Sequence, residues 1–131
     1  MRSGNKGARP KVVLVLGGGA AESDALFADL QAHGDFQILR AASGERAEIL
    51  LREAPVSLAL ACADAAVTEI ERLVAAIERT GRAIPVLAIR SARSTDPDRC
   101  AELGVAVLRA PLLPDALARS VEVVLGLKKH G

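Results

Sequence analysis

Apolar residues along this chain follow two alternating patterns. Short runs with little or no charge, typical of strands buried on both faces of a sheet, are separated by longer segments in which apolar residues recur every three or four positions, as on helices. The pattern predicts strands at residues 11–16, 36–39, 56–62, 84–89 and 105–108. The third run, within PVSLALACAD, has no charge before Asp64 and is expected at the centre of the sheet.

Helices are expected between these strands, with capping residues at their ends. The clearest helix follows the central strand and ends before Gly81, a residue type common after helices. Its apolar positions are Val67, Ile70, Leu73, Val74 and Ile77. The other helices are predicted to begin near Ser23, Ser43, Asp96 and Pro114. The apolar positions of the three longer ones are Leu26, Phe27 and Leu30, then Ala47, Leu50 and Leu51, and last Leu117, Val121, Val124 and Leu125.

Regular alternation of strands and helices with short connections predicts a single α/β domain with a doubly wound, five-stranded parallel sheet and five flanking helices. Right-handed crossovers and the flavodoxin-like strand order 2-1-3-4-5 would place helices one and five on one face and helices two, three and four on the other. Chemistry in such sheets collects beyond the carboxyl ends of the strands. The candidate edge is therefore formed by residues 17–19, 62–66, 90–93 and 109–111.

Length and composition fit one domain: the chain has 131 residues, 50% of them hydrophobic. We expect a disordered, polar leader at residues 1–10, the domain at 11–127, and a tail or the start of a linker to an output domain at 128–131. The leader has no apolar signal core, and we find no apolar run of the roughly 18 residues that a membrane span needs.

The net charge and the cysteine content limit the classes of partner and the cellular compartment that the sequence favours. Seventeen Lys and Arg against sixteen Asp and Glu give a net charge of +1, which provides no overall field for binding nucleic acid or a membrane surface. The two cysteines, Cys62 and Cys100, lack metal-binding or redox spacing and favour a reducing, cytoplasmic compartment. We therefore expect a protein partner or a small anionic ligand, and neither nucleic acid nor a membrane.

Several phrases of the sequence, KVVLVL, IPVLAI, AELGV and VLRAPLLPDAL, resemble the receiver domains of response regulators, the CheY-like family of two-component signalling. In that family an acidic pair after strand one holds Mg²⁺, and the phosphorylated Asp ends strand three. The corresponding positions here hold Gly17, Gly18 and Cys62. The family's three switch positions also hold other residue types, namely Arg90, Val107 and Ala110. The resemblance implies a degenerate pseudo-receiver.

These replacements remove the chemistry of phosphorylation. Mg²⁺ needs oxygen ligands and glycine side chains supply none, so we expect no metal and no other cofactor. Asp64, two residues beyond Cys62, is either a displaced acceptor or, as we favour, a loop carboxylate paired with an arginine. Cys62 lacks a nearby histidine as a base and is expected to be a buried thiol. We therefore predict no enzymatic activity.

The predicted edge is basic where receivers are acidic. Arg90 and Arg109, with Arg93, could face backbone N–H groups of Gly18 and Gly19 and bind a phosphate-bearing ligand. Alternatively, Arg90 fills the space that metal and phosphate would occupy and pairs with Asp64 or Glu22, which locks one conformation. The sequence favours this closed arrangement.

The resemblance implies that the face formed by helix four, strand five and helix five makes dimers or partner contacts. Its charged residues alternate in sign: Arg99, Glu102, Arg109, Asp115, Arg119 and Glu122. Mixed-sign pairs can align a two-fold dimer, although exposed charge often serves only solubility. The expected function is a phosphorylation-independent signalling and interaction module; the alternative is a sensor of a nucleotide, a cyclic dinucleotide or a similar phosphate-bearing molecule.

Overall fold

The parallel sheet predicted from the sequence is confirmed. The computed structural model describes residues 11–17, 24, 27, 28, 30–32, 36–91, 97–109 and 115–126. Five strands form one sheet with the order β2-β1-β3-β4-β5, and every pair of neighbours is parallel. The strands are β1 Lys11–Leu16, β2 Phe36–Ala41, β3 Val56–Ala61, β4 Val86–Arg90 and β5 Ala106–Arg109. The helices with defined bounds are α2 Gly44–Glu53, α3 Val67–Thr80, α4 Pro97–Glu102 and α5 Ala116–Leu125.

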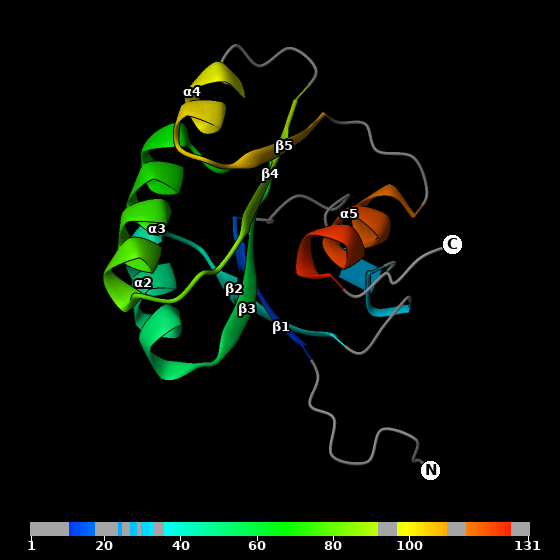
Figure 1. Cartoon of the computed structure of the whole chain (residues 1–131), viewed down its shortest axis with the longest axis horizontal. Coiled ribbons are helices and arrows are strands. Elements are labelled where there is room, and N and C mark those ends of the chain that lie inside the picture. Colours follow the sequence, from blue (N-terminus) through cyan, green and yellow to red (C-terminus); the bar gives the residue numbers. More distant parts are fainter. Residues whose placement is uncertain are drawn as a thin grey trace.

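Helices cover both faces of the sheet, as predicted (Figure 1). Helices α2 and α3 pack on one face with Cys100 of α4, in the core that contains Leu14 and Ala61. Helix α5 packs on the other face, together with Phe27 and Leu30. Residues 24, 27, 28 and 30–32 are helical, so this part of the first predicted helix is confirmed, whereas its predicted cap lies outside the described residues.

Side chains alternate between the two cores along the central strands. On β1, Leu14 and Leu16 face α2 and α3, and Val13 and Val15 face α5. All four are at most 1% exposed, so β1 is buried on both faces, as a continuous apolar run indicates. This packing fixes the register of the strands, because a shift by one residue would exchange the two cores.

Several strand ends differ from the sequence-based prediction. Strand β2 continues to Ala41, β3 ends at Ala61 just before Cys62, and β5 is Ala106–Arg109 rather than 105–108. Strand β4 begins after Pro85, which has no N–H and contributes only its carbonyl, to the N–H of Ala59 at 3.0 Å. It continues through Arg90, paired in register with Arg109.

Capping residues fix the ends of α2 and α3. The Ser43 hydroxyl accepts a hydrogen bond from the N–H of Arg46, as expected of an N-cap. Gly81 ends α3 with φ of 75°, a conformation that glycine adopts without strain. Within the described residues, no helix is both long and apolar enough to cross a membrane.

Candidate functional site at the carboxyl edge of the sheet

The carboxyl ends of β1, β3 and β4 meet at one edge, as the fold requires. The N–H of Cys62 donates to the carbonyl of Leu16 at 2.9 Å, so the residue after β3 lies beside the end of β1. The N–H of Gly17 donates to the carbonyl of Ala41 at the end of β2. The predicted positions Gly17, Cys62 and Arg90 therefore belong to one continuous edge.

Arg90 is the buried charged residue of the described part of the chain, with only 5% of its surface exposed. Its Nη1 donates to the carbonyl of Ala65 at 2.8 Å and, at the longer distance of 3.5 Å, to the carbonyl of Cys62. Both acceptors belong to the connection between β3 and α3. A guanidinium carries a permanent positive charge and several N–H donors, so it can satisfy carbonyl oxygens that water does not reach. Arg90 thus joins the end of β4 to this connection.

Asp64 brings a carboxylate to the edge from the same connection. Gly17 has φ of 86°, and a Cβ built on it would lie 2.6 Å from Oδ1 of Asp64. The Asp64 carboxylate therefore occupies the space next to Gly17. This carboxylate comes from the loop after β3, and only a residue without a side chain at position 17 leaves room for it.

Arg109 follows the same principle on the neighbouring strand. Its Nη1 donates to the carbonyl of Ser91 at 2.7 Å, in the connection that follows β4. Arg90 and Arg109, both predicted for an anion pocket, therefore direct N–H groups at main-chain carbonyls. The remaining predicted positions, Gly18, Gly19, Glu22, Arg93 and Ala110, lie outside the described residues.

The thiol of Cys62 is shielded from solvent. Cys62 is 2% exposed and packs in the core beneath α5, and Cys100 is fully buried on the other face. Because a nucleophilic thiol needs access to its substrate, this burial agrees with the predicted structural role. The described residues contain no cluster of three or more His, Cys, Asp or Glu side chains that could hold a metal ion.

The predicted interaction face divides into a tied part and an open part. Nε of Arg99 donates to Glu71 of α3 at 2.7 Å, and its Nη1 donates to Glu102 at 3.0 Å. These hydrogen bonds raise the pKa of Arg99, Glu71 contributing most, and they join α4 to α3. Val107, one of the three predicted switch positions, is partly buried against the core below α2 and α3.

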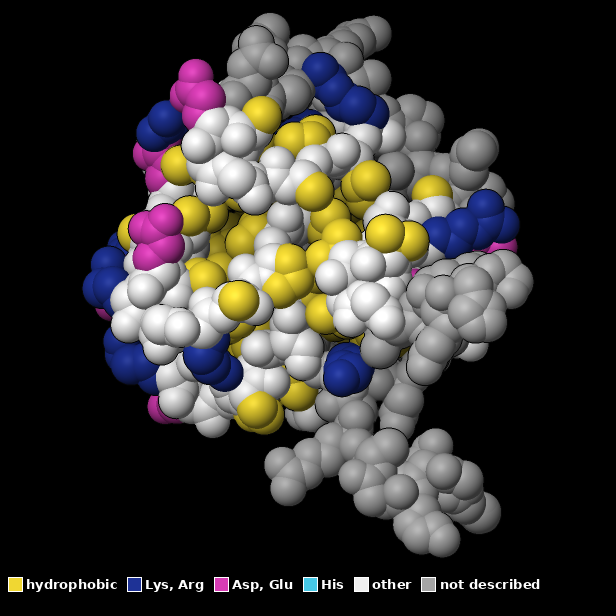
Figure 2. Space-filling model, viewed as in Figure 1, with side chains coloured by type: hydrophobic (Ala, Val, Ile, Leu, Met, Phe, Trp, Pro, Cys, Tyr) yellow, Lys and Arg dark blue, Asp and Glu magenta, His cyan; other side chains and the backbone are white. Residues whose placement is uncertain are grey.

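Helix α5 forms the open part of that face. It begins after Asp115, which has φ of 71°, and carries the exposed Arg119 and the half-buried Glu122. Val123 is 67% exposed, the most exposed large apolar side chain described. Figure 2 shows further hydrophobic side chains in the centre of the view, over the β4–β5 edge of the sheet.

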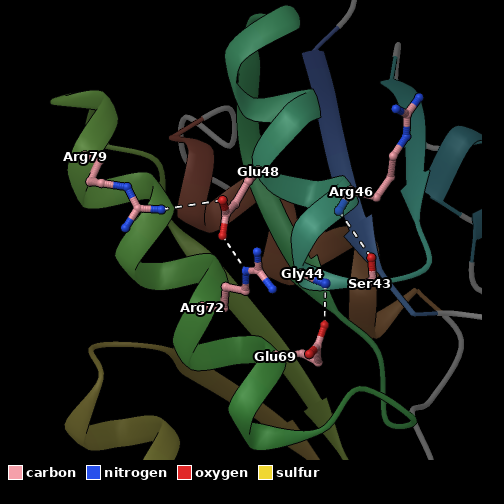
Figure 3. Close-up of polar contacts among 7 residues, drawn as sticks. All are labelled: Ser43, Gly44, Arg46, Glu48, Glu69, Arg72 and Arg79. Carbon is pink, nitrogen blue, oxygen red and sulfur yellow. Dashed lines mark hydrogen bonds and ion pairs between the residues drawn. The ribbon is translucent and has the colours of Figure 1, made fainter.

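A polar network between α2 and α3 was not predicted from the sequence (Figure 3). Glu48 accepts a hydrogen bond from Nε of Arg72 and lies 3.6 Å from Nη2 of Arg79. A carboxylate oxygen of Glu69 accepts from the N–H of Gly44, the first residue of α2. A Cβ on Gly44 would lie 2.9 Å from Cδ of Arg72, so glycine allows this close approach.

This network shifts the pKa values of its members. The hydrogen bond from Arg72 lowers the pKa of Glu48, with added attraction from Arg79 and Arg52, and the same hydrogen bond raises the pKa of Arg72. Spacing rules within one helix could not reveal contacts between residues 24 positions apart. The only sequence signal was a glycine directly after the cap of α2.

Comparison with known proteins identifies the fold. No protein-family model matches the sequence, and no curated protein matches it. The strand order and layers define an open, doubly wound parallel α/β domain. More particularly, this is the fold of response-regulator receiver domains, which recurs among the solved structures similar to it.

Three of these structures show how far the similarity extends. The signal receiver domain of a modulated diguanylate cyclase from Desulfovibrio desulfuricans has a TM-score of 0.71 at 23% identity, over 92% of this chain and 97% of that one. A CheY-like receiver domain protein from Methanospirillum hungatei gives 0.71 at 19%, over 90% and 95%. The Vibrio cholerae chemotaxis protein CheY4 gives 0.70 at 18%, over 88% and 98%. The shared feature is the fold.

Proposed function

We propose that this chain is a non-enzymatic signalling module with a receiver fold that works through protein contacts and without aspartyl phosphorylation. The observation that carries the proposal is the buried Arg90, whose guanidinium donates to the carbonyl oxygens of Ala65 and Cys62. A permanent positive charge of the chain itself thus lies beside Cys62, the position that the resemblance gives to the phosphorylated residue, and a divalent cation would be repelled there. The two buried cysteines, Cys62 and Cys100, suit a reducing compartment such as the cytoplasm.

The chemistry of phosphoryl transfer supports this proposal. Transfer to a carboxylate requires an acceptor and a metal ion that neutralises the developing charge, and that metal takes carboxylate and other oxygen ligands. Cys62 replaces the acceptor and is buried. Gly17 has no side chain that could bind a metal ion. The carboxylate beside it belongs to Asp64, two residues beyond the position of the phosphoryl acceptor.

We further propose that the partner surface is the open part of the predicted face, α5 with the adjoining β5 edge. It combines the exposed Val123 with Arg119 and Glu122 of opposite charge. An apolar centre with mixed charges around it can pair with its own copy across a two-fold axis or with another protein. Signalling would then depend on assembly. Such a module can act as a separate protein or as the regulatory part of a longer one.

Incubation with acetyl phosphate and Mg²⁺, followed by intact-mass measurement, tests the absence of phosphorylation. We expect an unchanged mass, with an ordinary aspartate-bearing receiver as the positive control. A gain of one phosphoryl group would overturn the proposal. A thermal-shift screen with nucleotides and cyclic dinucleotides tests the sensor alternative. A sensor would be stabilised by its ligand, by about 2.7 kcal/mol at a hundred times the dissociation constant, whereas an interaction module would show no shift.

Sedimentation over a range of concentrations tests the proposed surface. The wild type should self-associate, and Arg119→Glu should shift it towards the monomer because the reversed charge opposes pairing. Arg46→Glu, an equally exposed charge reversal on α2, is the matched control and should behave as wild type. Self-association that both variants weaken equally would move the surface away from α5, and a wild type that stays monomeric would exclude the dimer.

A further inference from the structure

A pocket of about 130 Å³ opens on the outer side of the α2–α3 pair, near the carboxyl ends of both helices. It is lined by Glu48, Leu51, Arg52, Ala76, Arg79 and Thr80. Leu51 and Ala76 belong to the buried core and provide an apolar floor. The pocket lies on the face of the sheet opposite α5, away from the surface proposed above (Figure 1).

Arginines dominate the rim of this pocket. Glu48 is the pocket's own carboxylate, and Arg72 already binds it by a hydrogen bond. Arg79 lies 3.6 Å from Glu48 and its side chain remains 65% exposed, so most of its donors face solvent. Arg52 is exposed and makes no hydrogen bond or ion pair within the described part of the chain. Figure 2 shows basic side chains gathered at the lower left, where the carboxyl ends of α2 and α3 lie.

The pocket is held in shape before anything binds. Thr80 donates to the carbonyl of Ile77 at 2.6 Å and accepts from the N–H of Arg82 at 3.0 Å. Nη2 of Arg82 donates to the carbonyl of Leu51 at 2.8 Å and so ties the end of α3 to α2. With the Glu48 and Glu69 contacts further along, the two helices are joined over their whole length. A preorganised surface loses less conformational entropy on binding.

Size and chemistry together indicate the kind of ligand. Pockets that enclose small molecules usually measure about 300–1,000 Å³, whereas this pocket is smaller and open. It matches a single aliphatic side chain, and pockets that accept one anchoring side chain beneath exposed arginines are typical of protein interfaces. We propose that the α2–α3 pocket docks an acidic segment of a partner protein, with one aliphatic side chain on Leu51 and Ala76 and flanking carboxylates on Arg52 and Arg79.

NMR titration of the intact, ¹⁵N-labelled chain tests this proposal. The probe is a blocked synthetic peptide with a central leucine between two aspartates on each side. We expect amide shifts confined to residues 48–52 and 76–80, and an affinity that falls at high salt because exposed charges are screened. The double variant with Arg52→Glu and Arg79→Glu should have a dissociation constant for this peptide that is at least about tenfold higher.

Controls separate the two parts of the pocket. Arg46→Glu, on α2 outside the pocket, should bind the peptide like wild type. Peptides with glycine for leucine, or with lysines for the aspartates, should bind at least about tenfold more weakly. Equal shifts from all three peptides, equal shifts from acetate alone, or no shift at all would overturn the proposal. Arg52→Gln, which only removes charge, repeats the test should the double reversal disturb the fold. The acetyl phosphate result is independent of this outcome.

Discussion

The carboxyl edge and the α2–α3 pair use arginine in opposite ways. Arg90 at the edge is 5% exposed and binds main-chain carbonyls, whereas the Arg72 side chain between the helices is 48% exposed and binds the Glu48 carboxylate. A buried acceptor that loses its donor cannot turn to water, but a partly exposed carboxylate such as that of Glu48 can. The same residue type is therefore essential to the fold in one region and an adjustable contact in the other.

The largest effect is expected from Arg90→Met, which keeps an unbranched side chain but removes every donor. The buried carbonyl of Ala65 loses the guanidinium donor, whereas that of Cys62 still accepts from the N–H of Ala65 at 2.9 Å. We expect a loss of about 2–4 kcal/mol in the free energy of unfolding, measured by chemical denaturation. Arg109→Met, on the adjacent strand in register but exposed, should cost no more than about 0.5 kcal/mol. Equal losses in the two variants would remove the distinction between buried and exposed arginines.

A smaller effect is expected from Gly17→Ala at the same edge. The backbone there has φ of 86°, and the new Cβ would meet Oδ1 of Asp64 at 2.6 Å. We expect a loss of about 1–2 kcal/mol from the left-handed conformation and the displaced carboxylate. In an Asp64→Ala background the same substitution should cost less, because only the backbone contribution remains. A double-mutant cycle measured by denaturation gives the difference, and strict additivity would show that the carboxylate does not lie over Gly17.

The smallest effect concerns the α2–α3 pair and depends on pH. The hydrogen bond from Arg72 holds the pKa of Glu48 below its ordinary value of 4.5. The ionised carboxylate therefore stabilises the fold above pH 4.5, and this contribution is lost as the pH falls through the lowered pKa of the folded state. Glu48→Gln should be slightly less stable than wild type at neutral pH, and the two denaturation curves should converge in acid. A difference that is constant with pH would exclude the charge as its cause.

Hydrophobic periodicity was sufficient to predict the strands and helices, and the strand order and layers followed from the usual topology of doubly wound sheets. Buried strands such as β1 and amphipathic helices such as α3 are specified by local patterns, and Gly81 marks the end of α3 in both sequence and structure. Two of the errors at strand ends occur where an arginine belongs to the strand, at Arg90 of β4 and Arg109 of β5. Arg90 was placed after β4 because charge normally ends a buried strand, yet its guanidinium finds carbonyl partners and the strand continues through it.

The candidate site was predictable in position but only partly in chemistry. Topology alone brings Gly17, Cys62 and Arg90 to one edge, and the sequence favoured a closed arrangement in which Arg90 fills the site. That Arg90 would bind carbonyls of the connection after β3, and that Asp64 would lie over Gly17, depends on loop conformation, which residue patterns do not specify. The α2–α3 pocket likewise arises from contacts between distant segments.

The guanidinium of Arg90 is covalently part of the polypeptide, and this has a consequence for timing. A magnesium ion can be chelated and an acyl phosphate hydrolyses, so the activated state of an ordinary receiver has a limited lifetime. A side chain neither dissociates nor decays. In a module built in this way, the duration of a signal would be set by how long partners stay bound and how quickly the cell makes and destroys the chain.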